Sequence, residues 1–407
     1  MPALEEYRSI VGSDVLEELY LLGRRLTGKT VLNVNSTAVG GGVAEILNRL
    51  VPMMNDIGVA AKWDVIKGGD AFYAVTKKFH NALHGEAEDI GPHDYEVYEQ
   101  AQKENMAAMS LDADIVFVHD PQPAGLVRAR VAGLNRWIWR CHIDLSRPDT
   151  GLWEYLKAYV RGYDACVFSA PCFSQELPIP QALIPPSIDP LSDKNRELAP
   201  EEIDAVLAKL EIPRDLPLVT QVSRFDRLKD PLGVIEAFKM ARVYSDARLV
   251  LVGGSADDDP EGTQILDRVR TKARGESDIT VLCLPPTSHL EINAIQRASS
   301  IILQKSVREG FGLTVAEALW KGKPVIAGAV GGIPQQVTHR YSGILTRSIE
   351  GTAYWLKQLL NEPGYGRRLG ENGREHVKQN FLITRQLRDY LLLFLAVERP
   401  GMEMIRL

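Results

Sequence analysis

Short apolar runs alternate with stretches of helical periodicity along almost the whole chain. In the first half, runs of strand length bounded by turn residues lie at 30–35, 61–66, 115–119, 137–142, 165–169 and 182–184. The second half repeats the pattern at 218–222, 248–252, 279–284, 301–304, 325–328 and 343–345. Helical stretches between the runs lie at 43–55, 98–110, 152–159, 231–244, 262–273, 290–298 and 313–320. Because this alternation is typical of parallel βαβ units, the sequence predicts an α/β chain with two doubly wound parallel sheets.

The chain is too long for one ordinary domain. Its 407 residues predict two domains, since a single hydrophobic core stops growing beyond about 250–300 residues. Between the halves, the segment 185–195 holds three prolines among polar residues, as an interdomain connection does. We expect a first domain at 1–190, a second at 191–384 and a hinge at the connection. For the amphipathic terminal segment, about 385–407, packing on either domain stays open, including packing back on the first.

Composition argues against several classes of protein. With 45% hydrophobic and 25% charged residues, the chain has an average globular composition. A net charge of −6 argues against a general nucleic-acid binder. Residues 1–26 are acidic where a signal peptide would be basic, and the most apolar stretch, 390–397, is far shorter than the roughly 20 residues that span a bilayer. We expect a cytoplasmic protein with no nucleic-acid or membrane partner.

The cysteines do not point to a metal or a redox centre. Cys141, Cys166, Cys172 and Cys283 form no Cys-x-x-Cys pair, which zinc sites and thioredoxin-like chemistry use. Buried free thiols are therefore the expectation, and no metal site is predicted.

Glycines follow the first predicted strand of the chain. In open α/β sheets ligands bind at the carboxyl ends of the strands, so the loops there are the places to look for binding residues. Gly40, Gly41 and Gly42 occupy the first such loop and directly precede a predicted helix. Glycines let a phosphate or sugar approach the backbone, and the helix N-terminus presents N–H groups. The pattern is neither GxGxxG nor a Walker loop, so a tight turn and a ligand loop both stay open.

Two basic residues follow the strand predicted at 218–222. Arg224 and Lys229 precede Pro231, which suits the first turn of a helix. A guanidinium offers a planar fork and an ammonium a point charge, and the pair suits a diphosphate leaving group. Solvated surface charge is the alternative.

Two glutamates follow the strand predicted at 301–304. Glu309 lies in a glycine-rich loop, and Glu317 falls about one turn inside the helix expected from Leu313. One carboxylate can then face a group above the helix N-terminus while the other reaches a neighbour beside it. A sugar nucleotide has this layout of sugar hydroxyls, diphosphate and ribose. Carboxylates that only cap the helix are the alternative.

Histidine and aspartate recur at the ends of two strands in the first half. His119 and Asp120 follow one run, and His142 and Asp144 follow the next. A lone histidine is usually structural, but the repeated placement leaves a binding role equally open. The polar segment 72–85 does not fit plain secondary structure, and a loop and a substrate contact are both open for it.

The second-half motifs together resemble those of retaining glycosyltransferase family four, whose GT-B architecture has two facing Rossmann-like domains. The motifs are Ser223-Arg224, Lys229, Glu309-Gly310-Phe311-Gly312, Glu317, Gly322-Lys323-Pro324 and Gly331-Gly332-Ile333-Pro334. Two positions depart from the family pattern. Gln335 stands where an acidic residue often follows the Gly-Gly-x-Pro motif, and Ser223 where a glycine is usual. Neither is expected to touch the reacting atoms.

This resemblance implies roles for individual residues. Arg224 and Lys229 would bind the diphosphate, and Glu309 the hydroxyls of the donor sugar. His142 would lie near the C6 hydroxyl of that sugar or offer its backbone carbonyl. The remaining donor contacts would come from Gly41, Gly42, Leu284 near the nucleobase, Phe311, Gly312, Leu313 and, on the ribose, Glu317.

The first-half motifs resemble the trehalose glycosyltransferring synthases, so the resemblance covers nearly the whole chain. The motifs lie at 80–85, 119–123, 139–144 and 186–191. They imply reversible transfer of α-glucose from a nucleoside diphosphate glucose to C1 of free glucose, which gives α,α-trehalose. Acceptor contacts are assigned to His80, Asn81, Asp120 and Asp144.

The implied reaction has small-molecule sugars and a sugar nucleotide as its partners. ADP- or UDP-glucose is the co-substrate, no cofactor is obligatory, Mg²⁺ is an optional accessory, and a homodimer stays open. A retaining trehalose phosphorylase is one rival, although a ribose-binding carboxylate at Glu317 would have no task there. A non-catalytic nucleotide-sugar sensor is the other rival.

Overall fold

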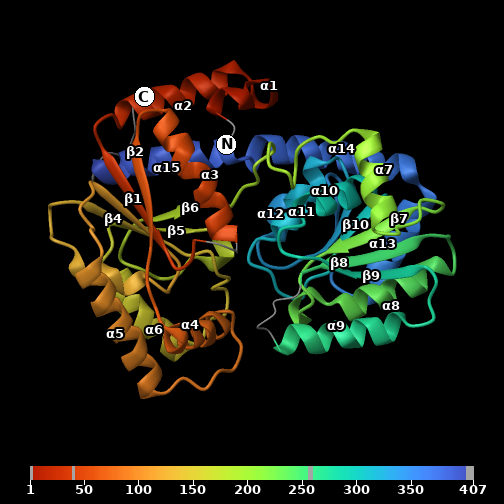
Figure 1. Ribbon diagram of the computed structural model, residues 1–407, viewed down its shortest axis with the longest axis horizontal. Coiled ribbons are helices and arrows are strands. Elements are labelled where there is room, and N and C mark those ends of the chain that lie inside the picture. The colour runs from red at the N-terminus through yellow and green to blue at the C-terminus, as the bar shows by residue number, and fades with distance from the viewer. Residues whose placement is uncertain (1–2, 39–41, 255–259, 400–407) are drawn as a thin grey trace. The chain divides into compact units, whose positions relative to one another are not determined.

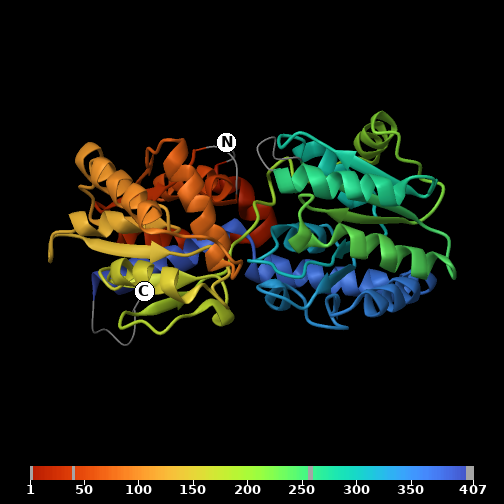
Figure 2. The ribbon, with the colours of Figure 1, turned by 90° about the horizontal axis from the view of Figure 1, so that it is seen from below.

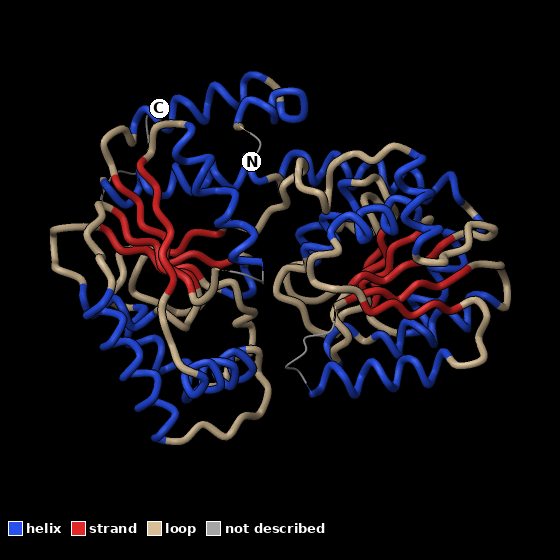
Figure 3. The backbone as a smooth tube through the Cα atoms, in the orientation of Figure 1, coloured by secondary structure: helices blue, strands red, loops and turns tan. Residues whose placement is uncertain are grey.

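The computed structural model describes residues 3–38, 42–254 and 260–399 and divides into two compact units. The first unit comprises Met1–Pro186 and Ile383–Leu407, and the second Ser187–Leu382. Figure 3 shows that the strands of each unit form one twisted sheet between layers of helices. The predicted pair of doubly wound parallel sheets is confirmed.

The first unit is built on a parallel sheet with the strand order β2-β1-β3-β4-β5-β6. Its strands are β1 (Thr30–Asn35), β2 (Ala60–Val65), β3 (Ile115–His119), β4 (Arg136–Arg140), β5 (Ala165–Phe168) and β6 (Gln181–Leu183). The inner strands β3 and β5 are buried throughout, as expected for parallel strands with both faces covered. The strand order reverses between β1 and β3.

Helices cover both faces of this sheet. They are α1 (Arg8–Val11), α2 (Ser13–Arg25), α3 (Gly42–Asp56), α4 (Asp70–Leu83), α5 (Pro92–Ala108), α6 (Thr150–Val160) and α15 (Ile383–Glu398). Helices α2, α3 and α15 pack together on one face, and α4, α5 and α6 lie on the other (Figure 1). Tyr390 and Phe394 of α15 contact the ring of Phe117 in β3. The chain therefore returns from the second unit to complete the core of the first.

Residues 72–85 are mostly helical, so the expectation of a loop there is wrong, while substrate contact by this segment stays a prediction. Helix α4 buries Phe72, Val75 and Phe79 along one side. These side chains recur at helical spacing and form an apolar stripe. Lys77, Lys78, His80, Asn81 and His84 are interspersed with these apolar side chains, and that polarity concealed the helical period.

The second unit has the strand order β12-β11-β10-β7-β8-β9, again parallel. Its strands are β7 (Leu218–Val222), β8 (Arg248–Gly253), β9 (Ile279–Cys283), β10 (Ile301–Gln304), β11 (Val325–Gly328) and β12 (Ile344–Thr346). In this sheet the order reverses between β7 and β10, the arrangement of a Rossmann sheet.

The helices of the second unit also form two layers. They are α7 (Pro200–Lys209), α8 (Pro231–Arg242), α9 (Pro260–Ala273), α10 (His289–Ala298), α11 (Leu313–Trp320), α12 (Ile333–Gln336), α13 (Ile349–Asn361) and α14 (Pro363–Asn380). Helices α8, α9 and α13 share one apolar core with the sheet, and α7 and α10 share another. Figure 2 shows α8 and α9 side by side.

The cysteines only partly match their prediction. All four are free thiols, and Cys141 and Cys166 are buried as expected. Cys283 is half-buried and Cys172 is exposed, because Cys172 lies in a surface 3₁₀ turn, Pro171–Phe173. Within the described ranges, no helix has the length and hydropathy needed to cross a membrane.

Candidate functional site

The topology of the second unit brings the two predicted donor loops together. The loops 223–230 and 305–312 follow β7 and β10, the neighbouring strands at which the strand order reverses. Ligands of doubly wound sheets bind beside such a point. The backbone N–H of Val307 donates to the carbonyl of Leu228 at 2.8 Å, which ties the loops to each other.

Lys229 and Glu309 form an ion pair between these loops. The Nζ atom of Lys229 lies 2.7 Å from Oε2 of Glu309, and the side chains are only 17% and 10% exposed. The same oxygen accepts hydrogen bonds from Ser306 Oγ at 3.1 Å and from Gln304 Nε2 at 3.4 Å. Three donors thus hold the carboxylate in one place.

The backbone of Lys229 is also fixed. Lys229 ends the 3₁₀ turn Arg227–Lys229, whose first residue follows Asp226. The Asp226 carboxylate accepts from the backbone N–H of Lys229 at 3.0 Å. The backbone carbonyl of Lys229 accepts from Gln221 Nε2 at 2.8 Å. The ammonium group is therefore presented from a rigid turn.

Two further charged residues lie at this point, and the sequence analysis missed them. Lys305 pairs with Asp230, which has a left-handed backbone (φ 47°) and caps α8 by accepting from Gly233 N at 3.0 Å. Strained backbone of this kind is common at functional sites. Lys305 directly follows β10, so its position at a strand end was the signal that could have found it.

Arg224 does not join this group in the structure. Its Nη2 atom lies 3.3 Å from Asp226 Oδ2, and its side chain is 67% exposed. Lys229 and Glu309 are thus brought together, while Arg224 lies on the surface with a different partner.

The loop that carries Glu309 is packed against a glycine turn. Gly331 has a positive φ of 54°, and a Cβ atom there would lie 1.6 Å from the Glu309 carbonyl oxygen. Gly312, with φ 82°, precedes Leu313 at the start of α11, and its Cβ would lie 3.1 Å from Glu309 Cγ. Gln336 Nε2 donates to the Phe311 carbonyl at 2.5 Å. The Gly-Gly-x-Pro motif therefore serves to hold the Glu309 loop.

Glu317 lies in α11, one turn from its start. The residue is buried, and its Oε1 atom is 3.9 Å from Nζ of Lys194, a partner that the sequence analysis did not name.

Leu284 follows β9 and is half-buried against the core of α7 and α10. Because β9 is the edge strand, β8 lies between it and β7, the strand that Lys229 follows.

The glycine loop of the first unit is only partly described. Gly42 is the first residue of α3, which starts close after β1. Gly41 lies outside the described residues. The loop follows β1, one of the two strands at which the order of the first sheet reverses.

Asp120 and His142 lie together at the carboxyl ends of β3 and β4. The Asp120 carboxylate accepts from the backbone N–H of His142 at 2.7 Å, and its own N–H donates to the Arg140 carbonyl at 2.7 Å. Asp120 is a second left-handed residue, with φ 68°. Burial raises the pKa of its carboxyl to about 7, although the His142 N–H and the Arg140 charge oppose the shift.

The other acceptor residues have partners within or next to their own segments. The rings of His80 and His84 are 4.7 Å apart at the end of α4, and Asn81 Nδ2 donates to Glu88 Oε1 at 2.7 Å. Asp144 is buried and accepts from Ser146 N at 2.8 Å. Their assignment to the acceptor stays a prediction.

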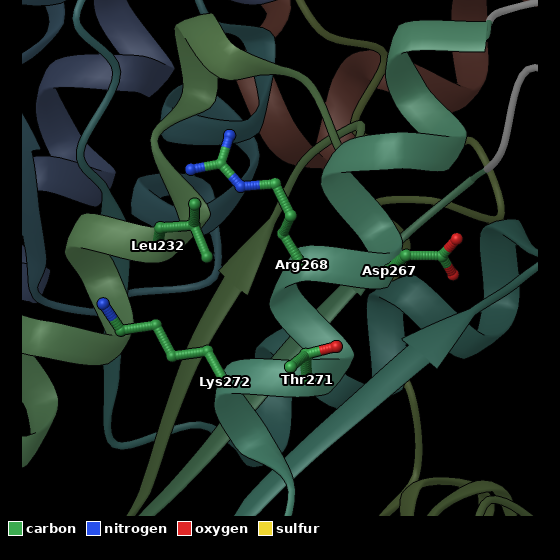
Figure 4. A pocket seen from close by; sticks show the side chains of 5 residues that line it. All are labelled: Leu232, Asp267, Arg268, Thr271 and Lys272. Carbon is green, nitrogen blue, oxygen red and sulfur yellow. The ribbon is translucent and has the colours of Figure 1, made fainter.

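A separate hollow of about 380 Å³ lies between α8 and α9 (Figure 4). It is lined by Leu232, Asp267, Arg268, Thr271 and Lys272. None of the predicted site residues belongs to it. Across the described part of the chain, no group of three or more His, Cys, Asp or Glu side chains is arranged to hold a metal ion.

Comparison with known proteins covers both units. The family model "Trehalose synthase, N-terminal domain" matches residues 33–175, and "Glycosyl transferases group 1" matches residues 202–376. The trehalose synthase of Rubrobacter xylanophilus is 44% identical over 403 residues, which cover 96% of each chain. That of Pyrococcus horikoshii is 43% identical over 394 residues, 95% of each chain.

More distant proteins share part of the sequence or the fold. A trehalose phosphorylase of Pleurotus pulmonarius is 29% identical over 92% of this chain, which spans only 58% of that longer protein. Among solved structures, an α,α-trehalose-phosphate synthase (UDP-forming) from Burkholderia xenovorans superposes with a TM-score of 0.73 at 14% identity. That match covers 91% of this chain and 100% of the other, and it shows a shared fold.

Proposed function

Because the chain belongs to the trehalose synthase family of GT-B glycosyltransferases, we propose that it transfers α-glucose from a nucleoside diphosphate glucose to free glucose. The product is α,α-trehalose, with the nucleoside diphosphate as leaving group. The observation that carries this proposal is the Lys229–Glu309 pair at 2.7 Å beside the reversal point of the second sheet. It offers an ammonium for phosphate and a carboxylate for sugar hydroxyls at one place.

The charges of this site suit a diphosphate leaving group. An ammonium has three donors, so Lys229 can approach a phosphate oxygen while it keeps its bond to Glu309. The N-terminus of α11, at Leu313, adds oriented N–H groups and a partial positive charge. Preorganised charges of this kind stabilise the negative charge that develops on the departing phosphate.

The transfer breaks the bond between C1 of the donor glucose and the phosphate oxygen. The C1 hydroxyl of the acceptor attacks from the same face, so the α configuration is retained. Its proton passes to the leaving phosphate oxygen, and no protein acid is needed because the diphosphate leaves well without protonation. Glu309 orients the donor sugar in this scheme, and Mg²⁺ stays an optional accessory that would supply positive charge to the phosphates.

Mass spectrometry of the products tests the proposal directly. The full-length protein is incubated with glucose and ADP-, UDP- or GDP-glucose in separate reactions. A non-reducing disaccharide of two hexoses, with α,α linkage by NMR, is the expected product. Absence of any disaccharide with all three donors contradicts the proposed function.

A trehalose phosphorylase is the second candidate, because proteins of that name match 92% of this chain. Incubation with trehalose separates the two candidates. Inorganic phosphate would yield glucose 1-phosphate in a phosphorylase, whereas ADP or UDP would yield nucleotide-glucose in the synthase. We expect only the nucleotide-dependent reaction.

A further inference from the structure

A line of hydrogen bonds crosses three neighbouring strands at the carboxyl edge of the first sheet. Nε of Arg140, the last residue of β4, lies 3.4 Å from Nδ1 of His142. Nε2 of His142 lies 3.2 Å from Nδ1 of His119, the last residue of β3. Nε2 of His119 lies 3.2 Å from Oδ1 of Asn33 in β1. Every ring nitrogen of the two histidines therefore has a partner.

The arginine end dictates where the protons lie. A guanidinium only donates hydrogen bonds and stays charged in proteins, so Nδ1 of His142 must be an unprotonated acceptor. The proton of a neutral His142 is then on Nε2, which donates to Nδ1 of His119. His119 in turn must carry its proton on Nε2.

The asparagine end gives the same answer independently. The Asn33 amide nitrogen donates to the Lys62 carbonyl at 3.3 Å, which turns Oδ1 toward His119. Because Oδ1 only accepts, Nε2 of His119 must carry the proton. Both ends thus require one direction of donation, from Arg140 through His142 and His119 to Asn33.

We propose that Arg140 is a positioning residue that locks His142 and His119 as neutral imidazoles with their protons on Nε2. A second proton on either ring would set two donors against each other, at Arg140 or between the rings. The two rings lie nearly parallel, with centroids 5.5 Å apart, which fits a fixed arrangement.

Among the described residues, the two carboxylates near the line accept from groups other than the imidazole rings, Asp120 from the backbone N–H of His142 and Asp389 from Arg385. Arg140 is completely buried, donates to the Ile184 carbonyl at 2.9 Å and lies over the ring of Tyr390, 5.3 Å from its centroid. The other charged or titratable groups nearby are Asp120 and Cys141 at the strand ends and Arg385 and Asp389 of α15. The carboxylate of Asp389 is paired with Arg385 at 2.7 Å.

Burial and the Arg140 charge lower the pKa of His119 to about 3 and that of His142 well below its usual range.

The consequence for the reaction rests on the proposed function: it limits the roles that the His142 ring can have in glucose transfer. Both ring nitrogens of His142 are used within the line, so the ring is neither the general base nor a cation beside the donor sugar. A neutral, oriented residue suits a site where positive charge develops on the sugar during transfer. His142 then acts through its backbone or as an uncharged side chain held in one orientation.

NMR spectroscopy of the full-length protein with ¹⁵N-labelled histidine tests the lock without any substrate. Long-range ¹H–¹⁵N spectra distinguish protonated from unprotonated ring nitrogens, and the His119→Asn and His142→Asn variants assign the signals. We expect both residues to show a protonated Nε2 and an unprotonated Nδ1, unchanged from pH 5.5 to 8.5. A proton on Nδ1 of His142, or titration of either ring in that range, overturns the proposal.

The Arg140→Met variant tests whether the arginine causes the lock. Without its donor, we expect His142 to exchange between tautomers and to titrate between pH 5.5 and 8.5. Arg136→Met, at the opposite end of the same strand, is the matched control and should leave both signals unchanged. If Arg140→Met folds and both rings keep the wild-type pattern, Arg140 is not the positioning residue. If it does not fold, the wild-type spectra still decide between the lock and its absence.

Steady-state kinetics of the transfer reaction provide a further test, which depends on the proposed function. In the transfer assay we expect Arg140→Met to lower kcat by roughly tenfold or more, with a new pH dependence between pH 6 and 8 and a smaller change in the donor KM. Failure of the wild-type protein to make any disaccharide would contradict the proposed function and leave the NMR result intact. The two failures are therefore distinguishable.

Discussion

Oε2 of Glu309 accepts a hydrogen bond from Nζ of Lys229 at 2.7 Å, although 80 positions of sequence separate the two residues. Strand order explains the contact, because β7 and β10 are neighbours while the chain between them builds β8 and β9. The pair therefore requires β7 and β10 to lie side by side.

Removing either member of this pair should abolish most of the transfer activity. We expect Lys229→Ala and Glu309→Ala each to lower kcat by at least about 100-fold, the scale of losing one preorganised charge contact. Because both groups act on the same donor, the double variant should lose less than the product of the two single effects. Steady-state kinetics of the three purified variants measure this.

Lys239→Ala is the matched control for these variants. Lys239 also pairs with a glutamate in the second unit, Glu276, at 2.7 Å, but lies on α8 away from the strand ends. The kcat of the Lys239→Ala variant should stay within about twofold of the wild-type value, since such ion pairs contribute little to stability. Near-normal turnover of a folded Lys229→Ala or Glu309→Ala variant would remove that residue from the catalytic set.

Substitution of Gly331 should damage both stability and donor binding. An alanine Cβ would lie 1.6 Å from the Glu309 carbonyl oxygen, and φ 54° disfavours a side chain. The Glu309 loop must then move, so we expect Gly331→Ala to lower the free energy of unfolding by about 2 kcal/mol or more and to raise the donor KM. Urea denaturation and kinetics provide the two measurements.

Gly364→Ala serves as the comparison. Gly364 lies in α14, and a Cβ there meets no atom within 4 Å. Since alanine has the higher helix propensity, the variant should be unchanged or more stable by up to about 1 kcal/mol. Equal stabilities of the two alanine variants would show that the contact between Gly331 and the Glu309 loop has no energetic importance.

Asp120 should make the stability of the protein depend on pH. Burial raises the pKa of its carboxyl from the ordinary value of 3.8 to about 7, so between these pH values the folded chain binds more protons than the unfolded chain. The contribution of Asp120 to the free energy of unfolding therefore falls as the pH rises from about 4 to about 7. Asp120→Asn keeps an oxygen acceptor for the His142 N–H but has no such titration.

The difference between wild type and Asp120→Asn isolates this effect. We expect the variant to gain stability relative to wild type as the pH rises from 4.5 to 7.5, measured by the midpoint of urea unfolding. Asp112→Asn, at an exposed aspartate of the same unit, should run parallel to wild type. Parallel curves for Asp120→Asn as well would show that the carboxyl titrates equally in the folded and unfolded states.

Glu317 should affect the affinity for the donor more than the rate of transfer. As a ribose ligand it makes charged hydrogen bonds, so Glu317→Gln should raise the KM for nucleotide-glucose by roughly 10-fold or more. Because the substitution also removes the partner of Lys194 at 3.9 Å, the double variant with Lys194→Met separates the two effects. If the double variant recovers the wild-type KM, Glu317 serves the ion pair and not the ribose.

Most strands and helices were readable from local pattern. β1, β3, β7, β10 and β11 begin and end where the sequence predicts. A run of β-branched residues between turn residues has few other ways to bury its side chains, so local chemistry suffices there. Helix α4 was missed because polar side chains such as Lys77, Lys78 and His80 are interspersed with its buried apolar residues.

The candidate site was readable in part, because residue types at strand ends reveal chemistry but not partners. Glu309 and Lys229 were named from their loops, yet their direct contact, and the different partner of Arg224, depend on how each side chain packs. The hydrogen bonds from Arg140 through His142 and His119 to Asn33 also depend on tertiary structure, because they form only when three strands lie next to one another.

Local side-chain pattern is thus enough to set the alternating strands and helices, the glycine-rich loops and the identity of the charged groups, since each depends on neighbours along the chain. The order of the strands is a property of the entire folded unit. It is that order, with the burial it imposes, which pairs distant charges, keeps Glu317 and Arg140 from solvent and fixes the protons of two histidines.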